Sequence, residues 1–124
     1  MDVTPIIPAG RQVIEAYASG LFRVSGIVHK NSILVFPDAT LAWPVSDAGS
    51  LTPDAFQPII ARGGVEVLLL GCGARMALVP AGLRKALREA GIVVDAMDTG
   101  AACRTYNVLL SEERRVAAAL IALA

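Results

Sequence analysis

Short apolar segments separated by turn-forming residues make up residues 13–45 of the chain. Phe22, Val24, Ile33 and Val35 supply apolar positions typical of strands that are buried on one or both faces. The interruptions are Gly20, Gly26, Lys30-Asn31 and Pro37-Asp38. This pattern predicts antiparallel strands joined by tight turns in the N-terminal half.

Residues 1–12 show no such pattern and contain Pro5, Pro8 and Gly10. These residues interrupt regular backbone hydrogen bonding, and chain termini fray readily. We therefore expect a flexible N-terminal arm over residues 1–12 and one folded domain over residues 13–124.

A helix start follows the predicted strands. Thr52 can cap it, Pro53 suits its first turn, and the carboxylate of Asp54 complements the helix dipole. Pro58 removes a backbone donor, so this helix should be kinked or short and should end at Gly63-Gly64.

The clearest unit is a β-α-β pattern that begins with the apolar run at residues 65–70. An amphipathic helix is predicted over residues 80–90, with Leu83 and Leu87 on its apolar face, and Gly91 suits its end. A second apolar run covers residues 92–97. The two runs should form parallel strands.

The remaining residues, 101–124, predict C-terminal helices. Ser111 can cap a second helix within this region, on which Val116, Leu120 and Leu123 would share one face. The predicted fold is thus a single compact α/β domain, in which an antiparallel β-rich N-terminal half packs with the β-α-β unit and the C-terminal helices.

Composition agrees with one domain and narrows the class of protein. The chain has 124 residues, 55% of them hydrophobic, which suffices for a core. Its 11 basic and 11 acidic side chains cancel, so nothing favours nucleic-acid binding. The longest apolar run, residues 116–124, is far shorter than the ~20 residues that span a bilayer. We expect a cytoplasmic protein that is not an integral membrane protein.

Candidate chemistry gathers where the two parallel strands end, because ligands tend to bind beyond the carboxyl ends of such strands. The loops after both strands and the helix that follows would meet at this edge, with arginines as anchors for an anion. The candidate pocket residues are Gly71, Cys72, Gly73, Arg75, Asp98, Thr99, Cys103, Arg104 and Asn107.

Each of these candidates also has a structural interpretation. Gly71 and Gly73 lack the third glycine of a dinucleotide fingerprint and permit a tight exit from a buried strand. Asp98 suits a helix cap. Asn107 can complete a polar pocket or tie down a neighbouring loop.

Cys103 is either a reactive thiolate near a helix start or a buried structural cysteine, and the buried form is the commoner one. The only histidine, His29, falls in the antiparallel half, and nothing places it as a base for this thiol. Cys72 and Cys103 make neither a metal-binding array nor a disulfide framework, so we expect reduced thiols, no metal and no cofactor. Without a paired acid and base, the pattern favours a protein that is not an enzyme.

Two segments carry a resemblance to a known family: GCGAR at residues 71–75 and MDTGAACRTYNVLLSEERRVAAALIAL at residues 97–123. They closely resemble a small α/β family, catalogued as a domain of unknown function, that includes the mitochondrial complex I (NADH:ubiquinone oxidoreductase) assembly factor 3 and an adipogenesis-associated human protein. Where many relatives have threonine between the two glycines, this chain has Cys72.

The resemblance implies a compact α/β fold, a bacterial member of the family, and no catalytic residues. It also implies a protein partner, with respiratory-complex subunits as candidates. The leading hypothesis is a non-enzymatic binding module that assists the assembly of a respiratory NADH dehydrogenase. One alternative is a small-molecule or anion-binding protein, with Cys103 as a candidate reactive cysteine, at the edge formed by residues 71–75 and 98–107. The other is a homo-oligomer formed through the alanine-rich C-terminal helix or an exposed β edge.

Overall fold

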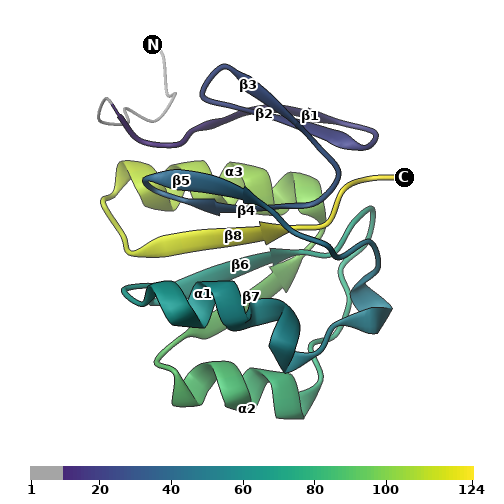
Figure 1. Ribbon diagram of the computed structural model, residues 1–124, viewed down its shortest axis with the longest axis vertical. Coiled ribbons are helices and arrows are strands. Elements are labelled where there is room, and N and C mark those ends of the chain that lie inside the picture. Colours follow the sequence, from purple (N-terminus) through teal and green to yellow (C-terminus); the bar gives the residue numbers. More distant parts are fainter. Residues whose placement is uncertain (1–9) are drawn as a thin grey trace.

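The computed structural model describes residues 10–124 (Figure 1). Most of the predicted N-terminal arm lies outside the described residues. At its end, the backbone N–H of Gln12 donates to the carbonyl of Pro37. The described chain forms a single α/β domain with two sheets, which confirms the predicted fold class.

A small antiparallel sheet comes first. It has the order β1-β2-β3, and its strands are joined by tight turns. The strands are β1 (Ile14–Ala18), β2 (Leu21–Val24) and β3 (Ile27–Lys30). The larger sheet begins with an antiparallel hairpin of β4 (Ile33–Phe36) and β5 (Ala39–Ala42). The antiparallel N-terminal half is therefore confirmed.

The larger sheet has five strands in the order β5-β4-β8-β6-β7. Its remaining strands are β6 (Val67–Gly71), β7 (Val93–Met97) and β8 (Val116–Leu120). β6 pairs in parallel with both β7 and β8, whereas β4 pairs antiparallel to β8. The predicted parallel pair is thus present, and β8 joins it to the antiparallel hairpin.

The helices lie on both faces of this larger sheet (Figure 1). Two short 3-10 helices cover Ala48–Ser50 and Pro53–Phe56. The α-helices are α1 (Gln57–Arg62), α2 (Ala81–Glu89) and α3 (Thr99–Ser111). Pro58 lies in the first turn of α1, and Gly63 follows its last residue, so a short helix ended by glycine is confirmed. The predicted cap is wrong: the Thr52 side chain makes no capping hydrogen bond, and Pro53–Phe56 forms a 3-10 helix because Pro58, which lacks a backbone donor, fits only the first turn of an α-helix. Among residues 10–124, no helix has both the length and the apolar character needed to cross a membrane.

Two hydrophobic cores result, one on each face of the larger sheet. Alternate residues of one strand divide between them, as Leu68 and Leu70 face one core and Leu69 the other. The first core is covered by α1, α2 and the 3-10 helices, and the second by α3 and the small sheet. The large sheet is therefore the middle of three layers.

The C-terminal segment corrects one sequence expectation. Residues 116–120 form β8 rather than a helix, and all five are buried between β4 and β6. Ser111 ends α3 instead of starting a new helix, with its hydroxyl donating to the carbonyl of Val108. Alanine favours a helix locally, but pairing with two neighbouring strands outweighs that preference. Since this segment is buried, it cannot form the predicted helical dimer surface; an exposed β edge stays a prediction.

Candidate functional site

The two loops of the predicted edge lie side by side where β6 and β7 end. The N–H of Cys72 donates to the carbonyl of Met97 at 2.8 Å, and the N–H of Thr99 donates to the carbonyl of Gly73 at the same distance. Gly71 packs so closely that an added Cβ would lie 3.0 Å from the Cα of Thr99. These backbone contacts give both glycines the structural role of a tight strand exit.

Thr99 is the centre of this edge, and its hydroxyl is fully buried. It accepts a hydrogen bond from the N–H of Gly73 at 2.8 Å and donates to the carbonyl of Ile121 at 2.7 Å. A single side chain thus ties the ends of β6 and β8 to the start of α3. Because both bonds go to backbone groups, the hydroxyl holds the fold together and does not face an open site.

The start of α3 is closed by the protein itself. A carboxylate oxygen of Asp98 accepts from the N–H of Ala101 at 2.9 Å, which confirms the predicted cap. The hydroxyl of Tyr17 covers Gly100, where an added Cβ would lie only 2.5 Å away. Arg104 donates to the same hydroxyl at 3.2 Å. An anion at this end of α3 would therefore be repelled by the Asp98 carboxylate and blocked by the ring of Tyr17.

Cys103 lies in the second turn of α3 and is 3% exposed. Burial raises the pKa of its thiol to about 12, and the nearby charge of Arg104 offsets this only in part. At neutral pH the group is a thiol and not a thiolate, so it is a poor nucleophile. Cys72 is partly buried, with its sulfur 3.7 Å from the carbonyl oxygen of Leu70. Both cysteines are free.

The raised pKa of Cys103 predicts a loss of stability at alkaline pH. The unfolded thiol ionises from its ordinary pKa of 9.0, while the folded thiol stays protonated up to about 12. Stability from this group is fully present below pH 9.0 and is lost as pH rises toward 12. Between pH 8 and pH 10.5 the loss from this group should be about 2 kcal/mol. Urea unfolding under reducing conditions measures it. Cys103→Ala should show a shallower decline, and an unchanged decline would contradict the assignment.

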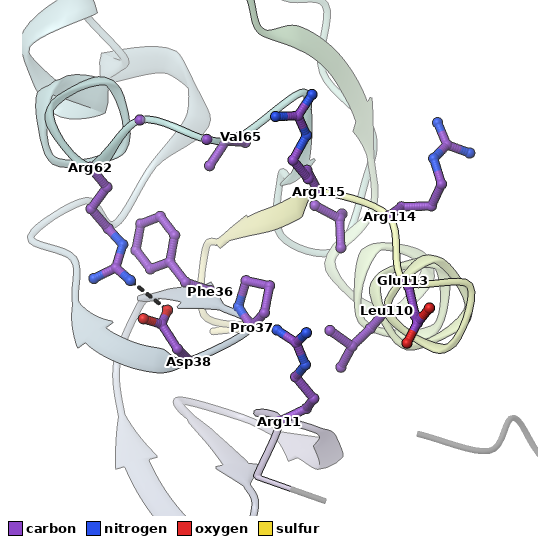
Figure 2. A pocket seen from close by; sticks show the side chains of 13 residues that line it. Arg11, Phe36, Pro37, Asp38, Arg62, Val65, Leu110, Glu113, Arg114 and Arg115 are labelled. Carbon is purple, nitrogen blue, oxygen red and sulfur yellow. Dashed lines mark hydrogen bonds and ion pairs between the residues drawn. The ribbon is translucent and has the colours of Figure 1, made fainter. Parts of the chain in front are cut away.

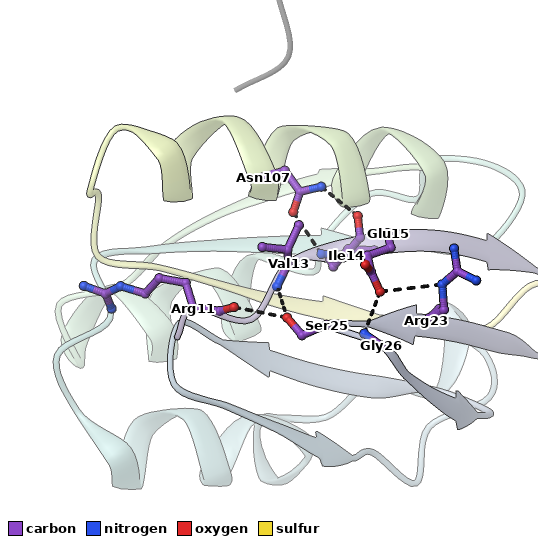
Figure 3. A network of polar contacts seen from close by, with 8 residues as sticks. All are labelled: Arg11, Val13, Ile14, Glu15, Arg23, Ser25, Gly26 and Asn107. Carbon is purple, nitrogen blue, oxygen red and sulfur yellow. Dashed lines mark hydrogen bonds and ion pairs between the residues drawn. The ribbon is translucent and has the colours of Figure 1, made fainter. Parts of the chain in front are cut away.

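Asn107 ties the small sheet to α3 (Figure 3). Its side-chain oxygen accepts from the N–H of Ile14 at 3.0 Å, and its side-chain nitrogen donates to the carbonyl of Ile14 at 2.8 Å. The sequence left two interpretations of Asn107, a polar pocket or an attachment to a neighbouring segment, and these bonds to Ile14 are an attachment of the second kind. Nearby, a carboxylate oxygen of Glu15 accepts from the N–H of Gly26 and pairs with Arg23. Asn107 therefore acts as a clamp between layers.

Removing this clamp should loosen the small sheet selectively. Asn107→Ala leaves the backbone of Ile14 without its side-chain partners, which should cost about 1–2 kcal/mol. Amide hydrogen exchange of β1 and β2 should therefore accelerate by about tenfold, while exchange in β6 changes little. Ser111→Ala on the same helix is the matched control, because its hydroxyl contacts only Val108. Equal acceleration in both sheets would contradict this prediction.

Arg75, the remaining predicted anchor, is exposed on the loop after β6 and makes no ion pair among residues 10–124. His29 lies on β3 of the small sheet. Within the same described range, no three His, Cys, Asp or Glu side chains form a group suited to a metal ion. The two loops of the predicted edge thus meet through their backbones, and Thr99 and Asp98 bond to backbone groups. Cys103, Arg104 and Asn107 line a separate cavity of about 410 Å³ beside β1, so their role as a site stays a prediction.

Sequence reasoning missed a second feature at the opposite edge of the large sheet, where β6 and β8 begin (Figure 2). A cleft of about 330 Å³ opens there between the residues after β4, the end of α1 and the turn before β8. We call it the arginine cleft, after the four lining residues Arg11, Arg62, Arg114 and Arg115. The doublet Arg114-Arg115 is its only local signal in the sequence.

A family model described as a protein of unknown function (DUF498/DUF598) matches residues 14–121. The chain belongs to this family. The match covers both sheets, α3 and the arginines of the turn before β8, so the resemblance seen in the sequence is confirmed.

Relatives within the DUF498/DUF598 family include bacterial and vertebrate proteins. An uncharacterised protein of Rhodobacter capsulatus is 40% identical over 91% of this chain and 86% of its own length. A Danio rerio protein named NADH dehydrogenase (ubiquinone) 1 alpha subcomplex assembly factor 3 is 36% identical over 88% of this chain. The chain spans 63% of that relative's length.

The fold also matches solved structures of similar sequence. A crystal structure described as an outer membrane protein of Bartonella henselae superposes with a TM-score of 0.85 at 38% identity. The match covers 93% of this chain and 98% of that one. The overall fold of this chain is therefore shared with that protein.

Proposed function

We propose that this chain is a non-enzymatic protein-binding module that helps to assemble a respiratory NADH dehydrogenase. The observation that carries the proposal is the similarity to an assembly factor at 36% identity over 88% of the chain. This similarity extends over 110 residues, well beyond a short motif. Related proteins with that name in Xenopus tropicalis and Homo sapiens are 34% and 30% identical.

The geometry of the predicted edge supports a role without catalysis. The Thr99 hydroxyl is used by the backbone of Gly73 and Ile121, and Asp98 caps α3. Burial raises the pKa of Cys103 further above neutral pH, which makes a reactive thiolate rarer than in an exposed cysteine. The side chains with nucleophilic or acid–base potential at this edge thus stabilise the fold, and binding through the surface remains the better-supported use of the domain.

Two measurements test the proposed role. The tagged chain, expressed at its native level, should enrich NADH dehydrogenase subunits from mildly solubilised cells relative to a tag-only control. Deleting its gene should lower the amount of assembled NADH dehydrogenase seen on native gels while a second respiratory complex is unchanged. Normal assembly in the deletion strain would contradict the role.

We further propose that the chain works in the cytoplasm. Support comes from the two free cysteines, which persist in a reducing compartment. The Bartonella relative is described as an outer membrane protein, so the place of this chain needs a direct measurement. Cell fractionation should recover it with cytoplasmic markers and, in part, with inner-membrane NADH dehydrogenase. Recovery with outer-membrane markers would contradict the proposal.

A further inference from the structure

The arginine cleft brings together side chains from segments that are far apart in sequence (Figure 2). Arg11 precedes β1, Arg62 ends α1, and Arg114 and Arg115 lie in the turn between α3 and β8. Figure 2 shows the guanidinium of Arg11 directed toward Pro37 and Leu110, in the interior of the cleft. At about 330 Å³, the space suits one or two side chains of a bound peptide.

Two of the four arginines are already neutralised. Arg62 pairs with Asp38 and stacks over the ring of Phe36, 4.2 Å from the ring centroid. Arg115 pairs with Glu66. These contacts fix the walls of the cleft and remove two positive charges from it.

The other two arginines keep their charge available. Arg11 and Arg114 make no ion pair among residues 10–124. Glu113, the remaining acid that lines the cleft, also has no ion-pair partner in this part of the chain. Two unpaired cations and one unpaired anion leave a single net positive charge. This balance suits one carboxylate, and Glu113 would repel a row of phosphates.

The floor of the cleft is apolar, and the helix that supplies part of it carries a buried hydroxyl without a hydrogen-bond partner. Phe36, Leu110 and Val116 are each no more than 3% exposed. On α3, one turn before Leu110, the hydroxyl of Tyr106 is buried without a hydrogen-bond partner in the described structure. Buried polar groups normally have partners, which marks this position as incomplete.

We propose that the arginine cleft binds an acidic segment of a protein partner, with a carboxylate at Arg11, an adjacent apolar side chain on the floor, and Arg114, which points outward in Figure 2, adding positive charge at the rim. That the partner is a protein, and not another acidic molecule, rests on the proposed function. The guanidinium group can bind a carboxylate through two parallel hydrogen bonds, which adds geometric selectivity to charge. The apolar floor then selects acidic segments that carry a hydrophobic residue beside the carboxylate.

Two matched double variants separate the effect of the cleft on binding from the effect of the net charge of the protein. Arg11→Gln with Arg114→Gln removes its two unpaired cations. Arg75→Gln with Arg88→Gln removes two exposed arginines that also make no ion pair among residues 10–124. Both double variants lose the same charge, and both should keep the unfolding temperature of the wild type because the altered side chains are exposed.

The probe is a random peptide library displayed on phage and selected on the intact domain. Wild type and the Arg75/Arg88 variant should enrich peptides with Asp or Glu beside an apolar residue, and the Arg11/Arg114 variant should not. For a selected peptide made synthetically, fluorescence polarisation should show affinity about tenfold weaker on the Arg11/Arg114 variant. Replacing its acidic residues with Asn or Gln should weaken wild-type binding by a similar factor.

Three results would overturn the proposal: no acidic enrichment on wild type, equal loss in both double variants, or stronger competition by a single-stranded RNA than by the acidic peptide. The cleft and the assembly role can also fail separately. Arginine-dependent peptide binding without any effect of gene deletion on NADH dehydrogenase would retain the cleft and reject the role. Normal peptide selection by the Arg11/Arg114 variant, together with an assembly defect in the deletion strain, would retain the role and reject the cleft.

Discussion

Thr99→Val is expected to lower the free energy of unfolding by about 2–4 kcal/mol, although it preserves the shape of the side chain. The substitution removes the hydroxyl that bridges the N–H of Gly73 and the carbonyl of Ile121. Thr99 is fully buried, so water cannot readily replace those bonds. Two backbone groups would then lose their partner at the end of two central strands.

Chemical denaturation of both proteins at neutral pH measures this effect. Thr105→Val is the matched control, because it makes the same change on the same helix at a partly exposed position. It should change stability by less than about 0.5 kcal/mol. A Thr99→Val protein as stable as this control would mean that the buried hydroxyl does not hold the edge together.

Phe56→Ala should have the larger effect, about 3–5 kcal/mol of unfolding free energy. The ring of Phe56 is fully buried beneath α1 and α2, and it packs edge-on against Trp43 at a centroid distance of 5.7 Å. The indole N–H of Trp43 in turn donates to the carbonyl of Ala55. Removing the ring opens a cavity at the point where the loop after β5 is attached to the core.

Thermal unfolding should show this loss as a fall in midpoint of about 10 °C or more for a domain of this size. Phe56→Leu is the informative second variant, since it refills most of the cavity and should recover more than half of the loss. Similar midpoints for the alanine and leucine variants would show that the edge-on contact with Trp43, rather than buried volume, dominates at this position.

The hydrophobic periodicity predicted an element correctly where the residues within that element were enough to define it. The β-α-β unit followed from apolar strands and an amphipathic helix, and the Asp98 cap from its position before α3. Tertiary contacts moved the boundaries of some elements. The strand predicted from residue 65 begins at Val67, and the N–H groups of Glu66 and Val67 both donate to the carbonyl of Arg115. Such a contact across the sheet cannot be read from a local pattern.

The errors arose where the decisive partner is distant in sequence. Ala117 and Ala119 face one core and Ala118 the other, so small side chains let β8 be covered on both sides. Locally the same residues favour a helix. The candidate edge was predicted to come together and does so, yet its polar groups bond mainly to backbone, as Thr99 does. The arginine cleft escaped prediction because three segments that are far apart in sequence supply its cations.

The central position of β8 has a consequence for synthesis on the ribosome. In the large sheet, β8 lies between β4 and β6 and pairs with both. Without β8, those two strands have no contact as neighbours in the sheet. While residues 116–120 are still inside the exit tunnel, the nascent chain holds two half-sheets with exposed, unpaired edges. The domain therefore completes its fold only after this strand emerges, and until then the nascent chain presents a natural binding site for ribosome-associated chaperones.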